Sequence, residues 1–138
     1  MSKIERFEDL EVWQKARELA SLIHELSIKS PLGKDYSLRD QINRSVGAIM
    51  DNIAEGFERG GNRELLQFLS IAKASSGETR SQLYRVLDKG YIAQNEFEKL
   101  SEKASEISKQ ISGFMSYLKT SEFKGEKYVR EPDSNFES

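Results

Sequence analysis

The chain has a single histidine, His24, and no cysteine, so few side chains could act as nucleophilic catalysts or metal ligands. Catalysis by serine requires a histidine beside the nucleophile to act as general base. His24 instead belongs to the rim of an apolar helical face, next to Trp13 and Ala20. A di-metal site in a helical bundle requires Glu-x-x-His pairs on two helices, which one histidine cannot supply. The sequence therefore predicts no catalytic, metal or cofactor-binding residue, and no enzyme activity.

Two further sets of polar residues could have a chemical role. The run Gly60-Gly61-Asn62-Arg63 precedes a helix and could hold an anion, but a helix C-cap followed by an N-cap at Asn62 accounts for it fully. Arg44, Asp51 and Glu55 form an outward stripe on one helix, and Glu55 has no partner that would make it a general base. This stripe either contacts another helix or subunit, or faces solvent.

Four amphipathic helices must position these residues. The clearest has apolar residues at alternating steps of three and four, which place them on one helical face: Phe97, Leu100, Ala104, Ile107, Ile111, Phe114 and Leu118. Similar periodicity predicts helices over about 7–28, 36–59 and 62–89, ended by glycines and by Pro31. Short connections make consecutive helices antiparallel. The predicted fold is all-α, an antiparallel up-down-up-down four-helix bundle.

Length and composition favour one domain. We expect the bundle to span 1–120 and the polar residues 121–138 to form a flexible C-terminal tail, because the periodicity ends after Thr120. No apolar run is long enough to span a membrane and the first residues do not resemble a signal peptide, which favours a cytoplasmic protein. The 21 Lys and Arg against 23 Asp and Glu leave a net charge of −2, which argues against strong attraction to nucleic acid.

Three blocks, in this order, carry a resemblance to a known family: residues 7–16 (FEDLEVWQKA), 52–57 (NIAEGF) and 68–78 (FLSIAKASSGE). The chain resembles, over about residues 5–120, the bacterial four-helix bundle proteins named for 23S ribosomal RNA intervening sequences. The resemblance implies a ring-like homo-pentamer. It also implies kinship with the accessory proteins of diversity-generating retroelements, which bind nucleic acid and a reverse transcriptase. Those proteins are strongly basic, whereas this chain is slightly acidic.

Small and apolar residues outside the core faces predict self-association. Gly47 and Ala54 lie opposite the core face of their helix, and a glycine in a helix interior needs a close neighbour to justify its cost. On the next helix, Leu66, Tyr84 and Tyr91 are expected on one flank, and Phe68 and Ile71 on the other. Two different patches suit a ring. The candidate interface residues are Gly47, Ala48, Ala54, Leu66, Phe68, Ile71 and Tyr84. The alternative is a broad single core with scattered surface aromatic residues.

A local basic surface gives the second hypothesis. The helix over 62–89 lies in the only segment with net positive charge, and its candidate nucleic-acid contacts are Lys73, Arg80, Tyr84, Arg85 and Lys89. Lys73 and Arg80 flank Tyr84, whereas Arg85 and Lys89 lie on the opposite face. Two basic residues per face would bind RNA weakly in a single copy. The sequence thus favours a self-associating assembly or adaptor module over an RNA-binding accessory protein of a ribonucleoprotein.

Overall fold

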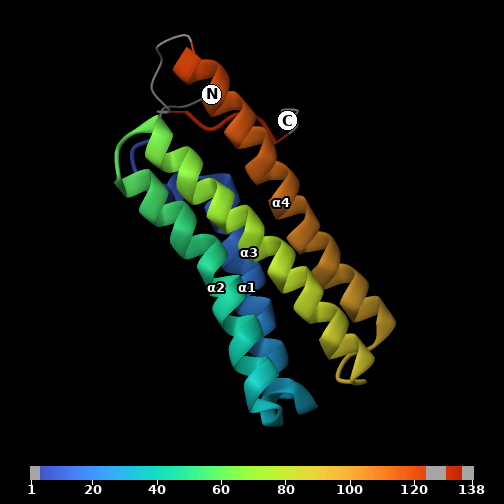
Figure 1. The fold of residues 1–138 in the computed structure, drawn as a ribbon. Coiled ribbons are helices and arrows are strands. Elements are labelled where there is room, and N and C mark those ends of the chain that lie inside the picture. Colours follow the sequence, from blue (N-terminus) through green and yellow to red (C-terminus); the bar gives the residue numbers. More distant parts are fainter. Residues whose placement is uncertain (1–3, 124–129, 135–138) are drawn as a thin grey trace.

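Four long helices form the molecule in the computed structural model, which describes residues 4–123 and 130–134. They are α1 (Glu11–Lys29), α2 (Tyr36–Glu58), α3 (Asn62–Asp88) and α4 (Gln94–Phe123), with short 3-10 helices η1 (Phe7–Asp9) and η2 (Pro31–Lys34) before α1 and α2. Figure 1 shows consecutive helices running in opposite directions, and α4 completes the bundle by packing against both α3 and α1. The predicted all-α, up-down-up-down four-helix bundle is confirmed.

The predicted heptad faces form the core. All seven apolar positions of α4 between Phe97 and Leu118 are buried, the most exposed being Phe97 at 6%. The core positions of the other helices are buried in the same way, from Val12 in α1 to Val86 in α3. Each helix therefore turns one apolar stripe toward the bundle axis, as the sequence period requires.

Two glycines end the middle helices, as expected. Gly60 and Gly90 follow α2 and α3 with φ of 82° and 76°, in the left-handed region that glycine adopts without strain. After α3, the Gly90 N–H donates to the Leu87 carbonyl and the Tyr91 N–H to the Val86 carbonyl. This pair of hydrogen bonds is the Schellman motif, which satisfies the last carbonyls of the helix and turns the chain toward α4.

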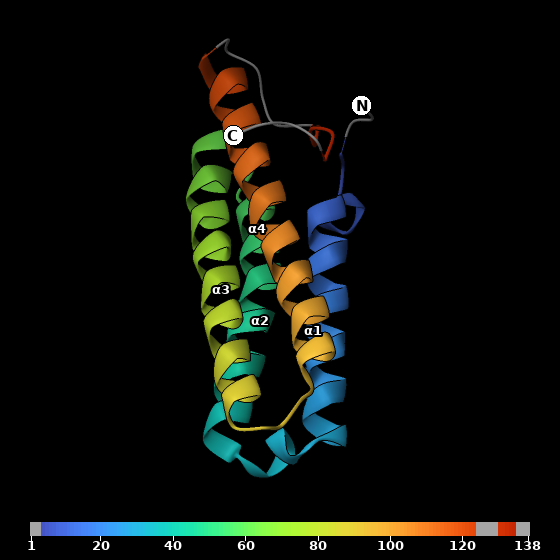
Figure 2. The same cartoon turned by 90° about the vertical axis from the view of Figure 1, so that its right-hand side faces the viewer.

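Three predicted helix boundaries differ from the structure. The first helix begins at Glu11 and not at Phe7, because Leu10 has an extended backbone (φ −72°, ψ 123°) that separates η1 from α1. Asn62 is the first residue of α3 and not its N-cap, a position that Gly61 occupies with extended backbone. The fourth helix continues past Thr120 to Phe123. Of the predicted tail, 124–129 and 135–138 lie outside the described residues, and 130–134 return to the start of α1 (Figure 2).

Buried polar side chains join α2 to α3 and α3 to α4. Ser45 lies between two residues of α3, donating from Oγ to Gln82 Oε1 at 2.6 Å and hydrogen-bonding Thr79 Oγ1 at 2.9 Å. Ser76 Oγ donates to the Ala104 carbonyl at 2.7 Å. All four side chains are buried and hydrogen-bonded, so none of their buried polar atoms lacks a partner.

Candidate interaction surfaces

A cavity of about 630 Å³ opens between the end of α1 and the start of α4. Its apolar lining includes Leu22, Leu26, Ile92 and Leu100. Charged side chains of both signs line it too, including Glu25 and Lys29, which form an ion pair. The hydrogen bond from Lys29 lowers the pKa of Glu25. Its lining contains no histidine or cysteine.

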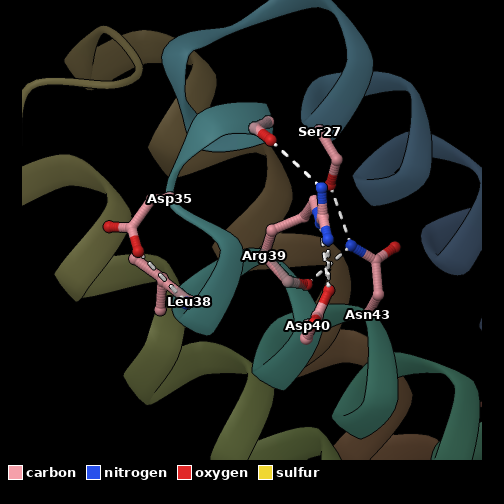
Figure 3. A network of polar contacts seen from close by, with 7 residues as sticks. Ser27, Asp35, Leu38, Arg39, Asp40 and Asn43 are labelled. Carbon is pink, nitrogen blue, oxygen red and sulfur yellow. Dashed lines mark hydrogen bonds and ion pairs between the residues drawn. The ribbon is translucent and has the colours of Figure 1, made fainter.

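His24 lies in a second, shallower cavity with residues of α2, close to the polar network in Figure 3. In that network Asn43 Nδ2 donates to Ser27 Oγ at 2.9 Å, and the Arg39 guanidinium donates to the Gly33 carbonyl at 3.2 Å. Arg39 also pairs with Asp40. His24 itself is exposed. These contacts join the end of α1 to the start of α2, which is a structural task.

Asp35 forms a further polar cluster at this end of the bundle. One carboxylate oxygen accepts hydrogen bonds from Lys89 Nζ and from the Tyr91 hydroxyl, both at 2.9 Å. The other accepts from the Leu38 N–H at 3.3 Å, which caps α2. The hydrogen bond from Lys89, followed by those from Tyr91 and Leu38, holds the pKa of Asp35 below its usual value. The cluster ties the start of α2 to the end of α3.

Replacement of Lys89 by alanine should move the Asp35 pKa back toward its ordinary value. Because the folded-state pKa is lowered, the contribution of Asp35 to stability is present above its unfolded pKa and is lost as pH falls through the folded pKa. A carboxyl NMR titration of wild type and Lys89→Ala measures the shift directly. Lys99→Ala, which removes an exposed lysine of α4, should leave the Asp35 titration unchanged. An unaltered Asp35 pKa in Lys89→Ala would contradict this assignment.

The predicted interface residues of α2 lie in different surroundings. A Cβ added at Gly47 would meet nothing within 4 Å, so this glycine faces open space on the outside of the bundle. Ala48 lines a groove between α2 and α3 with Arg44 and Glu78. Ala54 is half-buried and packs against the core, so it is less outward than its sequence position suggests. Gly47 and Ala48 remain open to a neighbour.

The predicted interface residues of α3 are also divided. Phe68 packs against Gly56 of α2 and lies under the Arg59 guanidinium, whose carbon is 5.1 Å from the ring centre. Leu66 is half-buried against the core, whereas Ile71 is 44% exposed. Tyr84 is 51% exposed, although one side of its ring contacts Phe97 of α4.

The tyrosines do not share a flank, which corrects the sequence prediction. Tyr84 reaches α4, whereas Tyr91 reaches Asp35 before α2. Tyr91 follows Gly90, and the left-handed turn there takes it off the helical periodicity on which the prediction rests. Ile71 and Tyr84 are therefore the apolar residues of α3 most available to a partner.

The basic residues of α3 do not form one patch. Arg85 donates to Gln41 Oε1 of α2 at 2.8 Å, and Lys89 pairs with Asp35 at 2.9 Å, so the charge of Lys89 is compensated within the chain. Arg80 is half-buried, and its Nε has no hydrogen-bond partner among the described residues. Lys73 is exposed. Of the four predicted basic contacts, exposed Lys73 and Arg85 are therefore the two that could still present charge to a polyanion.

The fold and these surfaces define the class of protein, a helical bundle whose outer helix faces are exposed. Among residues 4–123 and 130–134 no group of three or more His, Cys, Asp or Glu side chains could hold a metal ion. Within the same ranges no helix is long and apolar enough to cross a membrane. A model of the 23S rRNA-intervening sequence protein family matches residues 8–113. The chain belongs to this family, which confirms the resemblance carried by its three sequence blocks.

A solved structure shares the fold. It is the crystal structure of a protein of unknown function from the S23 ribosomal protein family of Bacteroides thetaiotaomicron, 25% identical to this chain with a TM-score of 0.68. The similarity covers 78% of this chain and 98% of that one. The search of curated proteins finds no match.

Proposed function

We propose that the chain is a non-enzymatic, cytoplasmic assembly or adaptor module that works by self-association. The observation that carries this proposal is the open space around Gly47 in the interior of α2. Glycine in a helix interior costs about 1 kcal/mol relative to alanine. Nothing within the protomer approaches this position closely enough to require it. The close approach of a neighbouring subunit would require a glycine at this position.

The surroundings of Gly47 support the same interpretation. Gly77 of α3 is exposed and also has nothing within 4 Å of an added Cβ. Because Ser45 pairs with Thr79 and the two helices are antiparallel, Gly47 and Gly77 lie at one level of the bundle. Ala48 lines the groove between α2 and α3, and Ala74 of α3 is exposed, so both helices carry small residues near this level. Ile71 and Tyr84 on α3 supply exposed apolar area for a second contact.

Gly47→Leu should lower the mass of the assembly measured by light scattering while circular dichroism still reports a helical protein. The leucine side chain would fill the space that the neighbouring helix needs. Lys109→Leu, which adds the same side chain at an exposed position of α4, should leave the mass unchanged. A mass five times that of the 15.8 kDa chain would identify a pentameric ring. A monomeric wild type at micromolar concentration would refute self-association.

A further inference from the structure

Helix α1 begins without a cap of its own. Its N-cap position is held by Leu10, an apolar residue that is 1% exposed and makes no side-chain cap hydrogen bond. The first intrahelical bond runs from the Gln14 N–H to the Leu10 carbonyl. The N–H groups of the preceding residues, Glu11 to Trp13, therefore need acceptors from outside the helix.

A carboxylate from the far end of the chain supplies two of these acceptors. Glu131 Oε1 accepts from the Glu11 N–H at 2.6 Å, and Glu131 Oε2 accepts from the Val12 N–H at 3.0 Å. Each oxygen thus pairs with one amide, in the manner of an anion bound at a helix N-terminus. Pro132, the next residue, is buried, whereas Asp133 and Ser134 are exposed. Glu131 and Pro132 therefore anchor the segment, whereas the next two side chains do not.

The Glu131 side chain is half-buried, and its carboxylate lies against the first backbone amides of α1. Burial removes water from the carboxylate and raises its pKa, while the N–H groups of Glu11 and Val12 favour the charged form. The nearby charges are of both signs, since Glu11 raises the pKa and Lys15 lowers it. Lys15 also pairs with Glu11 at 3.1 Å, so its charge is shared. The backbone amides are the principal partners of this carboxylate.

We propose that the start of α1 is a binding site for an acidic residue followed by proline, and that Arg130–Ser134 is a docking segment that fills this site within the same chain. The segment joins the end of α4 to the start of α1 at the same end of the bundle, because the chain leaves α4 at Phe123 and returns to the first turn of α1. Within the described residues, the apolar core cluster includes no residue of this segment. The segment can therefore leave while the bundle stays folded, which makes it a detachable strap. This proposal is independent of self-association.

The test measures amide hydrogen exchange in the full-length chain by NMR. In wild type the Glu11 and Val12 amides should be protected, and Glu131→Ala should speed their exchange about tenfold, because a helix cap is lost. Glu131→Gln keeps one acceptor oxygen and should give an intermediate rate. Asp133→Ala, which changes an exposed neighbour, should have no effect. Amides in the centre of α1, such as Leu19 and Ile23, should stay slow in every variant if docking is separable from folding.

Addition of a peptide completes the test. A capped peptide with the sequence of residues 130–134 should restore protection of Glu11 and Val12 in Glu131→Ala, whereas the same peptide with glutamine for Glu131 should restore less. The proposal is overturned if Glu131→Ala leaves both amides protected, or if Asp133→Ala exposes them equally. Wild-type protection that increases with protein concentration would overturn docking within one chain, because a second copy would then supply the carboxylate. General unfolding of Glu131→Ala would overturn the separable strap.

Discussion

Ile111→Ala should lower the free energy of unfolding by about 2 to 5 kcal/mol, since a buried isoleucine shortened to alanine loses its transfer energy and leaves a cavity. Ile111 is completely buried and lies in the middle of the α4 heptad face. Helix α4 packs against α3 and α1, and the close packing of a protein core limits how far such a cavity can be closed by local shifts. Chemical denaturation followed by circular dichroism measures the change.

Lys109→Ala provides the matched control, two residues away on the same helix. Lys109 is exposed on the outer side of α4, and its replacement by alanine should change the free energy of unfolding by less than about 0.5 kcal/mol. Equal losses for the two variants would mean that α4 presents a different face to the core.

The second large effect is expected at Gly56, a glycine of α2 that lies directly against side chains of α3. A Cβ added there would lie 2.7 Å from Phe68 Cβ and 3.1 Å from Leu65 Cδ1. Distances below about 3 Å cannot be accommodated without moving one helix away from the other. Gly56→Leu should therefore lower the free energy of unfolding by about 3 kcal/mol, the upper part of the usual range for overpacked cores. Thermal and chemical denaturation should agree on this loss.

Gly77 offers the comparison, because it is also a helical glycine but is exposed and has open space around it. Gly77→Ala should raise the stability by up to about 1 kcal/mol through helix propensity alone. Opposite signs at Gly56 and Gly77 would separate a glycine that packing within the protomer requires from one that it does not. A stable Gly56→Leu would show that α3 can move outward freely.

The helices were predictable because burial imposes a period on the sequence. Phe97 to Leu118 shows this most clearly, since each apolar residue recurs after three or four positions and all of them are buried. The glycine stops at Gly60 and Gly90 were predictable for a local reason, namely the positive φ that the turns require. The N-cap of α2 was predictable too, because Asp35 is an aspartate directly before a helix.

The contacts that the sequence did not reveal join residues far apart in the chain. Gly56 has no side chain and so adds nothing to an apolar heptad pattern, and the residue that it contacts, Phe68, belongs to the next helix. Phe68 was therefore predicted as an outer residue, although it packs within the protomer. Glu131 lies about 120 residues from the amides that it caps, in a segment without periodicity. The separation of Tyr84 from Tyr91 depends on a single turn at Gly90, which helical periodicity cannot anticipate.

The hydroxyl and amide groups buried between α2 and α3 make the two helices distinguishable along their length. Apolar heptads alone would allow one helix to slide past the other by seven residues and still bury leucine and isoleucine side chains. Such a slip would part Ser45 from Thr79 and Gln82, and each unpaired buried group costs about 1 to 3 kcal/mol. The aligned arrangement is thereby selected over its shifted alternatives. The alignment that places Gly47 and Gly77 at one level of the bundle is then a fixed property of the fold, so the buried polar atoms also help to determine the shape of the outer surface.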